Sequence, residues 1–353
     1  MRGEAPALLD DNSIEMQAFQ YMEKGGGLQL RDLPIPQPGP GWVQLQVKAA
    51  GLCHSDCHIL KGIDGVVQRP ITLGHEVSGI ITALGPDVKE FKTGERVTVG
   101  LFSYPIKLRD WTMAIGLGFD GGYGEFVLAP VARLVHIPDS LSFSQAAVAT
   151  DAMATSYHAV VVEAAAKPGM TIGVIGIGGL GMSGLGFGVL KGAKVYGIDI
   201  SESKFKEAKR LGASGCFKSL EDAQDVDFDA IVDFAGTGAT TTQAIQKVSE
   251  GGKVVVVGLA GSEITIPSYA LIGRSVSLIG SFGASEQDLR DVFDLLANKS
   301  IEPELTEIPF AEIPAGLDAL DRGETQGRLW SDPSKAKISS MVSVKLSEGL
   351  RQN

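Results

Sequence analysis

The pattern of apolar and polar positions along this chain of 353 residues changes most clearly near Asp151. Before that point, short runs with apolar residues at every second position are separated by turns rich in glycine and proline. This period of two is typical of half-buried strands, which we expect at residues 28–30, 42–47, 77–81, 96–99 and 124–128. The proline-rich stretch 33–41 predicts a stiff connector. The first part of the chain is therefore predicted to be an irregular, β-rich domain.

After Asp151, apolar runs alternate with helix-like segments. A helix is expected over 152–163, followed by strands near 171–176, 194–199, 229–234, 253–258 and 275–281 with helices between them. Repeated strand–helix units predict a parallel, doubly wound sheet with right-handed crossovers. From about residue 303 the pattern is mixed, with a helix over 310–322 and a strand over 327–330. We expect this last part to rejoin the β-rich domain; residues 1–15 are interpreted as an extension and 331–353 as a tail of unassigned role.

A glycine-rich turn joins the first strand of the doubly wound region to a helix. Its sequence is Gly176-Ile177-Gly178-Gly179-Leu180-Gly181. Gly176 permits a tight turn, Gly178 lets backbone N–H groups approach a pyrophosphate, and Gly181 lets helix and strand pack closely. The spacing and the flanking elements favour a dinucleotide site over a glycine-rich turn without a ligand.

Asp199 ends the next apolar run and is the candidate selector of the cofactor. A carboxylate there accepts hydrogen bonds from the adenosine ribose and repels a 2′-phosphate. No arginine follows it directly, and Glu202 adds a second negative charge, so the sequence favours NAD(H) over NADP(H). Lys204 is a further candidate cofactor contact. The alternative role for Asp199 is to cap the next helix, which Ser201 could also do.

Composition narrows the classes of partner. With 42 acidic and 31 basic residues, the net charge of −11 argues against nucleic acid and anionic membranes as partners. No apolar run approaches the length of a membrane span, and the N-terminal residues do not have the pattern of a signal peptide. Three cysteines make no disulfide framework. We therefore expect a cytoplasmic location.

Two short segments of the β-rich part carry candidate chemistry. They are Gly51-Leu52-Cys53-His54-Ser55-Asp56-Cys57-His58 and Gly74-His75-Glu76. A thiolate, an imidazole and carboxylates are the donors of an open zinc site, which has three protein ligands and a replaceable water. The residues alone leave a second interpretation open, a buried cysteine and a surface histidine without metal.

Four motifs together resemble the zinc-dependent medium-chain alcohol dehydrogenases. They are Gly51–Asp56, Gly74–Gly79, Gly121–Phe126 and the glycine-rich turn, in the family's order and spacing, and the resemblance covers about residues 16–332. It implies an α/β fold: a GroES-like β-rich catalytic domain (1–157 and 300–353) and a Rossmann NAD-binding domain with a doubly wound parallel sheet (158–299). The active site would lie in the cleft between the two domains.

The resemblance also assigns roles around a catalytic zinc. Cys53 and His75 match the first two ligands, and Asp151 stands where many members have a cysteine as the third. Glu76 resembles a neighbouring or transient fourth ligand. Ser55 would accept the alcohol proton and pass it, through the nicotinamide ribose hydroxyl, to His58. Hydride would move between the alcohol carbon and nicotinamide C4.

Further positions match residues that hold the cofactor. His54 stands at the pyrophosphate-contacting position, Thr155 beside the nicotinamide, and Arg328 at a phosphate contact, while Asp56 would orient a group that binds zinc. Each has an ordinary alternative. Ser55 could be a turn hydroxyl, His58 a surface histidine, Thr155 a core residue and Arg328 a salt-bridged side chain.

One departure from the family concerns the lobe that binds a structural zinc through four cysteines in many members. Residues 97–121 contain no cysteine, so we expect one catalytic zinc and no structural zinc. The corresponding loop, 101–111, is apolar and aromatic. It is expected to pack on itself, to contact another subunit or to reshape the substrate mouth.

The sequence thus favours an NAD(H)-dependent zinc alcohol dehydrogenase or carbonyl reductase whose small-molecule substrate is an alcohol, aldehyde or ketone. The alternatives are a metal-free enoyl or quinone reductase of the same superfamily, a polyol dehydrogenase, and a nucleotide-binding protein whose site has decayed. The small residues Ala152 and Ala154 would leave room for a bulky substrate. The apolar strand 276–281 lies where this family pairs subunits, which predicts a homodimer, with a homotetramer as the alternative.

Overall fold

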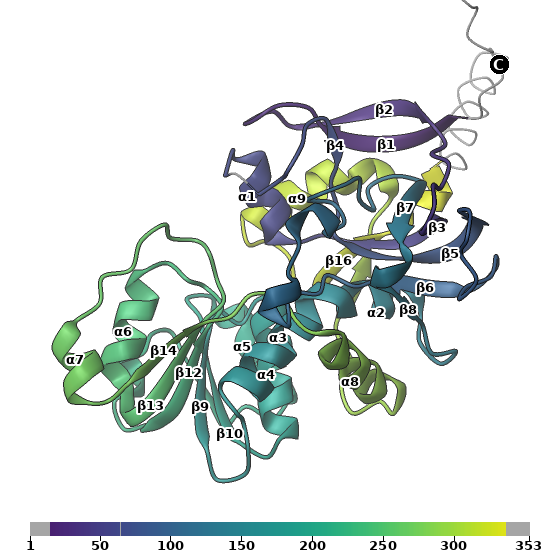
Figure 1. Ribbon diagram of the computed structural model, residues 1–353. Coiled ribbons are helices and arrows are strands. Elements are labelled where there is room, and N and C mark those ends of the chain that lie inside the picture. Colours follow the sequence, from purple (N-terminus) through teal and green to yellow (C-terminus); the bar gives the residue numbers. More distant parts are fainter. Residues whose placement is uncertain (1–14, 64, 337–353) are drawn as a thin grey trace, which may run out of the picture.

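The computed structural model describes residues 15–63 and 65–336, arranged as a β-rich part and a doubly wound part joined by a central helical segment (Figure 1). Nearly all of the predicted N-terminal extension and most of the predicted tail lie outside the described residues. The strands are β1 Glu15–Tyr21, β2 Leu28–Pro34, β3 Trp42–Gly51, β4 Ile71–Thr72, β5 Glu76–Leu84, β6 Arg96–Val99, β7 Phe126–Pro130, β8 Leu134–His136, β9 Thr171–Ile175, β10 Lys194–Ile198, β11 Gly215–Phe217, β12 Phe228–Asp233, β13 Val248–Val256, β14 Ser277–Gly280, β15 Leu305–Glu307 and β16 Arg328–Ser331.

The α-helices are α1 His54–Leu60, α2 Phe143–Val148, α3 Ala154–Tyr157, α4 Gly179–Leu190, α5 Phe205–Arg210, α6 Ala239–Lys247, α7 Ser268–Gly273, α8 Glu286–Ala297 and α9 Ile313–Asp321. Short 3₁₀ turns are η1 Ile106–Leu108, η2 Trp111–Met113, η3 Val131–Arg133, η6 Glu202–Lys204, η7 Glu221–Ala223, η8 Phe310–Glu312 and η9 Pro333–Lys335, and two π-helical stretches are η4 Ala149–Met153 and η5 His158–Glu163. No helix in the described part of the chain is both long and apolar enough to span a membrane.

The β-rich part is built around strand β3. Its sheet has the order β15-β16-β3-β5-β6-β8, and β7 pairs with β3 as well. Alternate residues Val43, Leu45 and Val47 are fully buried, as the period of two predicts, and they share one core with residues of β5, β6 and β7. Strand β16 pairs with β3 through Trp330 opposite Gly51. The chain therefore returns to the sheet of β3 after the doubly wound region.

The doubly wound part is a six-stranded sheet of order β11-β10-β9-β12-β13-β14 in which every pair is parallel. Ile172 and Val174 of β9 pack on one face with helices α4 and α5, and Ile175 packs on the other face with α6 (Figure 1). Because both faces are covered, the strands read as continuous apolar runs. The predicted α/β fold class, a GroES-like part with a Rossmann sheet, is confirmed.

Predicted and observed boundaries differ at a few places. Strand β13 begins at Val248, earlier than predicted, and its first part passes through a glycine pair in which Gly251 has φ 73°. Strand β2 runs to Pro34, into the stretch predicted as a connector. Because β2 is an edge strand, it can include a proline, which has no N–H to donate to a neighbouring strand.

The central helical segment is longer than predicted and runs from Phe143 to Glu163. Ser142 begins it with a capping box: the Ser142 side chain accepts a bond from the Gln145 backbone N–H at 3.1 Å, and the Gln145 side chain accepts one from the Ser142 N–H at 2.9 Å. Two π-helical stretches widen its turns, and Asp151 lies in the first of them. Such stretches are frequent at functional sites, because they displace one side chain from the regular helical register.

Candidate active site

A cleft of about 940 Å³ brings the predicted site residues together. It is lined by residues of both parts of the molecule and of the central helical segment. Of the sixteen residues to which the sequence analysis gives a metal, catalytic or cofactor role, all but Glu76 line this cleft; they are Cys53, His54, Ser55, His58, His75, Asp151, Thr155, Gly176, Gly178, Gly179, Leu180, Gly181, Asp199, Lys204 and Arg328. Glu76 is fully buried behind it.

The candidate metal ligands form a compact buried cluster. The Cys53 Sγ and the His75 Nε2 each lie 3.4 Å from the Asp151 Oδ2, and one donor atom from each of the three residues lies within 4.8 Å of the others. Ligand atoms around a tetrahedral zinc are separated by roughly 3.4–3.6 Å, given the usual bond lengths. Over residues 15–63 and 65–336, this is the one group of three or more such donors close enough to share an ion.

The surroundings of His75 fit a metal-binding imidazole. Its Nε2 faces the cluster, while its Nδ1 lies 3.3 Å from the Asp56 Oδ1, without the alignment of a hydrogen bond. Metal-binding histidines commonly present their other ring nitrogen to a carboxylate in this way. Burial disfavours the imidazolium, yet the carboxylates of Asp56 and Asp151 raise the pKa of His75 well above its ordinary value. Those carboxylates would stabilise a divalent cation in the same place, so the donors and their charges fit zinc.

Asp56 is held by two further contacts. Its Oδ2 accepts a hydrogen bond from the Tyr123 hydroxyl at 2.8 Å and one from the Cys53 backbone N–H at 3.2 Å. Asp56 and Tyr123 are both fully buried. Tyr123 lies in the motif Gly121–Phe126, and the sequence alone indicated no role for it. The contact shows that this motif positions Asp56.

Glu76 and Arg328 bind each other beneath the cluster. The Arg328 Nε donates to the Glu76 Oε2 at 3.1 Å, the Nη2 donates to the Oε1, and the Ala152 backbone N–H donates to that oxygen at 3.1 Å. The Arg328 Nη2 also lies 3.6 Å from the Asp151 Oδ2. Burial raises the pKa of Glu76 to about 7 although Arg328 opposes the rise. Burial likewise opposes the ionised form of Asp151, but His75 and Arg328 hold its pKa below the ordinary value.

Arg328 also borders the glycine-rich turn. A Cβ on Gly179 would stand 3.2 Å from the Arg328 Nη1. One guanidinium therefore contacts Glu76, approaches Asp151 and lies beside the predicted pyrophosphate site.

Two histidines and a serine line the cleft on and beside the first turns of α1. The Ser55 Oγ lies 3.6 Å from the Cys53 Sγ. Burial, followed by the charge of Arg328, lowers the pKa of His54; burial, followed by the charge of Lys61, lowers the pKa of His58. Both imidazoles are thus neutral at pH 7 and able to accept a proton.

Thr155 supports the third candidate ligand. Its Oγ1 donates a hydrogen bond of 2.9 Å to the Asp151 Oδ1, one helical turn away. The side chain is buried yet lines the cleft. It therefore combines the predicted position beside the cofactor with a contact to Asp151 that the sequence did not indicate.

The glycine-rich turn has the geometry that its sequence predicts. Gly176 has φ 78°, and a Cβ on it would meet the Ala235 backbone nitrogen at 2.9 Å. A Cβ on Gly181 would lie only 2.0 Å from the Gly176 carbonyl oxygen. No atom stands within 4 Å of the corresponding position on Gly178, where the turn faces the cleft. The start of α4 at Gly179 points its free N–H groups at this space.

Asp199 stands at the carboxyl end of β10. Its Oδ1 accepts a bond from the Ser201 N–H at 2.9 Å, and its Oδ2 lies 2.9 Å from the Lys204 Nζ. Lys218 lines the same end of the cleft and pairs with Glu202 at 2.6 Å. The predicted adenosine end of the cleft thus contains one buried carboxylate with a lysine beside it.

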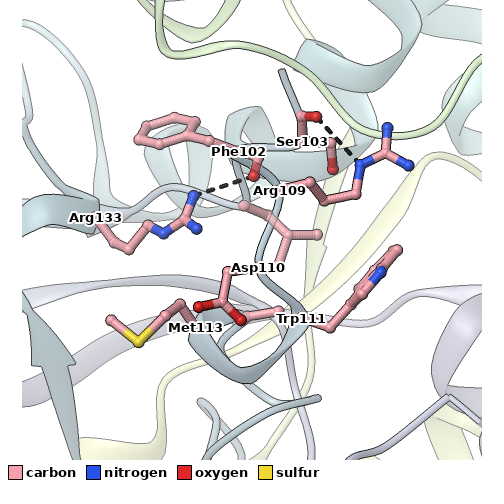
Figure 2. Close-up of a pocket in the computed structure, with 9 residues that line it drawn as sticks. Phe102, Ser103, Arg109, Asp110, Trp111, Met113 and Arg133 are labelled. Carbon is pink, nitrogen blue, oxygen red and sulfur yellow. Dashed lines mark hydrogen bonds between the residues drawn. The ribbon is translucent and has the colours of Figure 1, made fainter. Parts of the chain in front are cut away.

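The cysteine-free loop after β6 packs on itself and also reaches the cleft. Figure 2 shows Arg133 donating to the Phe102 carbonyl (Nη1 to O, 3.0 Å) and Arg109 donating to that of Ser103 (Nε to O, 3.2 Å). The cavity enclosed there, about 10 Å³, has space for no more than one water. Trp111 and Leu101, from the same loop, line the large cleft.

Comparisons with known proteins agree with this architecture. Residues 39–139 match the family model "Alcohol dehydrogenase GroES-like domain", and residues 179–298 match "Zinc-binding dehydrogenase". An alcohol dehydrogenase of Geobacillus stearothermophilus is 30% identical over 89% of this chain and 98% of its own length. An NAD-dependent alcohol dehydrogenase of Sulfurisphaera tokodaii is 29% identical over 89% of this chain and 99% of its own.

Among solved structures, the acetophenone reductase of Geotrichum candidum in complex with NAD superposes with a TM-score of 0.85 and 29% identity, over 94% of this chain and 99% of that one. A thermostable alcohol dehydrogenase of Pyrobaculum aerophilum with bound cobalt and zinc gives a TM-score of 0.81 and 26% identity, over 91% and 100%. The two family models, the full-length relatives and the Cys53–His75–Asp151 cluster lead to one assignment. The chain belongs to the zinc-dependent medium-chain alcohol dehydrogenase family.

Proposed function

We propose that this protein is an NAD(H)-dependent zinc alcohol dehydrogenase that also works as a carbonyl reductase. The observation that carries the proposal is the shared cleft: the Cys53–His75–Asp151 cluster opens into the same space as the glycine-rich turn and Asp199. A metal that activates an oxygen and a dinucleotide that exchanges hydride would meet there. The similarity to a protein named acetophenone reductase supports the reductive direction.

Zinc and the nicotinamide would supply the redox chemistry, and side chains of the protein would transfer the proton. Zinc on these ligands would polarise the substrate oxygen, and nicotinamide would exchange a hydride with the attached carbon. Ser55 holds the substrate hydroxyl proton at its Oγ, beside Cys53. His58, neutral and on the cleft wall, is the final proton acceptor in alcohol oxidation and the donor in carbonyl reduction.

The remaining residues of the site hold the candidate metal ligands and the cofactor in place. Asp56, held by Tyr123, orients His75, and Thr155 orients Asp151. Arg328 binds Glu76 and borders Gly179, so it aligns the base of the metal site with the cofactor phosphate. Glu76 stays next to the cluster as a neighbouring carboxylate, and His54 faces the pyrophosphate. The proposed domain limits are 1–157 and 300–353 for the catalytic domain and 158–299 for the NAD-binding domain, which carries the glycine-rich turn.

We assign NAD(H) as the preferred cofactor and one catalytic zinc as the metal content. The buried Asp199 carboxylate disfavours a 2′-phosphate, and Lys204 beside it reduces that repulsion without removing it. Relatives named NAD-dependent support the preference. The lack of cysteine in residues 97–121 supports a single zinc.

A homodimer formed through the doubly wound sheet is the proposed assembly. Strand β14 lies at the edge of that sheet, with β13 on its other side. Nearby, Tyr269 and Ile272 of α7 are 85% and 76% exposed. Unpaired strand edges and exposed apolar side chains of this size are features of subunit interfaces.

The test is an oxidation assay with a panel of primary and secondary alcohols, with NAD⁺ and NADP⁺ compared in the same buffer. We expect alcohol-dependent formation of NADH, a higher kcat/KM with NAD⁺ than with NADP⁺, and loss of activity after treatment with a zinc chelator. An enzyme that reduces enones, ignores alcohols and tolerates the chelator would contradict the proposal.

A further inference from the structure

One stretch of the cleft wall is apolar and lies next to the candidate metal ligands. It is formed by Ile59, Ile63, Val66, Val67, Leu101, Trp111, Leu117 and Phe282. The charged residues of the lining lie elsewhere, at the metal cluster, on the first turns of α1 and at the adenosine end. Among the described residues, this stretch of the wall has no charged side chain.

Backbone contacts place the apolar stretch beside His75. A Cβ on Gly116 would approach the His75 backbone nitrogen to 3.1 Å, so the loop that carries Trp111 and Leu117 runs against the ligand segment. The Val67 N–H donates to the Leu117 carbonyl oxygen at 2.8 Å, which joins this loop to the segment after α1. A substrate whose oxygen points at the cluster would therefore contact these side chains.

Trp111 is fixed by an aromatic cluster. Its ring meets that of Phe282 edge to face, with the centroids 5.0 Å apart and the planes at 71°. The Arg109 guanidinium carbon lies 5.8 Å from both ring centroids and 5.6 Å from that of Tyr104. Arg109 is tied to the backbone by its bond to Ser103, visible in Figure 2. Edge-to-face rings and a cation over their faces are stabilising, so Trp111 has a defined position.

The cluster also joins two regions of the chain that are far apart in sequence. The Ser103 N–H donates to the Ala284 carbonyl oxygen at 2.8 Å, next to Phe282. Trp111 comes from the loop after β6, whereas Phe282 follows β14 of the doubly wound sheet. The wall is thus assembled from both parts of the molecule, and its shape depends on the cysteine-free loop.

Several apolar side chains of this wall are exposed to solvent inside the cleft, as expected for a surface that contacts a ligand. Trp111, Ile63 and Val67 are 44%, 54% and 56% exposed while lining a concave surface. Apolar surface in a cleft gains free energy when an apolar ligand displaces its water. Leu108 of the same loop is 73% exposed and does not line the cleft, so it gains nothing from such a ligand.

We propose that Trp111 is a specificity-determining residue. Together with Phe282 it forms the outer wall of the substrate site and selects alcohols and ketones with an aromatic ring or a comparably bulky apolar group beside the reacting carbon. Aromatic rings favour edge-to-face and offset contacts with such a ring. The side chains that form this stretch, among the described residues, offer a polyol no hydrogen-bond acceptor and a charged substrate no ionic partner. The inference rests on the proposed function and adds its substrate class.

The test compares 1-phenylethanol with 2-propanol, which share the reacting carbon and differ in the ring. The zinc-loaded enzyme with NAD⁺ is assayed as wild type, Trp111→Ala, Trp111→Phe and Leu108→Ala. We expect Trp111→Ala to lower kcat/KM for 1-phenylethanol by about tenfold or more, mainly through KM, and to leave 2-propanol within about twofold. Trp111→Phe should restore much of the loss, and Leu108→Ala should match wild type for both alcohols. An equal loss for the two alcohols, or an unchanged ratio, would overturn the assignment.

A binding measurement separates this inference from the proposed function. Benzamide, which exchanges no hydride, is titrated into the protein with NADH, and acetamide serves as the ringless control. Weaker benzamide binding in Trp111→Ala, by about tenfold, supports the wall even if wild type oxidises no alcohol, in which case the proposed function alone fails. Benzamide binding that is unchanged by the substitution overturns the wall, even if alcohols are oxidised.

Discussion

His58 shows how neighbouring charges prepare a residue for proton transfer. Burial disfavours its charged form most, Lys61 adds electrostatic repulsion, and Asp321 acts in the opposite direction. Lys61 and Asp321 are paired at 2.6 Å, so their effects on His58 are linked. With its pKa below the ordinary value, His58 stays unprotonated to lower pH and remains a proton acceptor under mildly acidic conditions.

Substituting Lys61 tests this role. Lys61→Gln removes the repulsive charge and leaves Asp321 unpaired, and both changes raise the pKa of His58. The acidic limb of kcat/KM for alcohol oxidation should therefore move to higher pH in a profile between about pH 5 and pH 8. Lys335→Gln, which removes a similarly exposed lysine paired with Glu307, is the matched control. A limb that stays in place, or moves to lower pH, would remove His58 from the proton path.

At the scale of single residues, the sequence predicted which residues line the cleft better than it predicted their contacts. The motifs supplied Cys53, His75 and Asp199, because each lies at a fixed position relative to a glycine. The pairing of Glu76 with Arg328 joins residues 252 positions apart, and no local pattern encodes it. The same holds for Tyr123, whose hydroxyl contact with Asp56 depends on how the loop before β7 meets helix α1.

At the scale of elements, the helical segment from Phe143 to Glu163 positions Asp151 and Thr155. The predicted helix covered only its later part and had regular turns. The widened π-helical turns were not predicted, because a shift of hydrogen bonds by one residue leaves the apolar pattern almost unchanged. Five of the six strands of the doubly wound sheet were predicted, because their apolar runs give a strong signal. Strand β11 was not predicted, because it has only three residues and all are half-buried. The loop after β6 was predicted to be aromatic, but the direction of its rings was not.

Strand β16 brings Arg328 to the buried carboxylates, which predicts a large effect on stability. Arg328→Met leaves Glu76 buried without its partner, and the free energy of unfolding should fall by about 3–5 kcal/mol. The double variant Arg328→Met/Glu76→Leu should be more stable than the single one, because no uncompensated charge remains. Urea unfolding followed by circular dichroism measures both.

The exposed pair of Arg322 and Glu324, 2.7 Å apart, provides the control for this prediction. Arg322→Met removes an arginine of the same kind from solvent, where ion pairs contribute little, and should leave unfolding nearly unchanged. Equal effects of the two arginine substitutions would show that the buried pair has no special role in stability.

At the scale of the whole molecule, the proposed dimer would join the two doubly wound sheets at β14. Ile272→Glu places a charge on the exposed apolar surface beside this edge and should convert the dimer to a monomer. Ile106→Glu is the control, since Ile106 is 64% exposed on the loop after β6. Analytical ultracentrifugation at micromolar concentration measures the mass of the assembly and so distinguishes dimer from monomer. A wild-type monomer, or a dimer that Ile106→Glu dissociates and Ile272→Glu does not, would contradict the proposed interface.

The β-rich part and the central helical segment supply the Cys53–His75–Asp151 cluster, and the doubly wound part supplies the glycine-rich turn of the same cleft, so the metal content tests the whole arrangement. The most direct measurement is zinc per chain by mass spectrometry, on wild type and Asp151→Ala purified without chelator. The account predicts about one zinc per wild-type chain and a largely empty site in Asp151→Ala. Wild type without zinc, or Asp151→Ala with full occupancy, would contradict the proposed site, and about two zinc ions per chain would contradict the single-metal assignment.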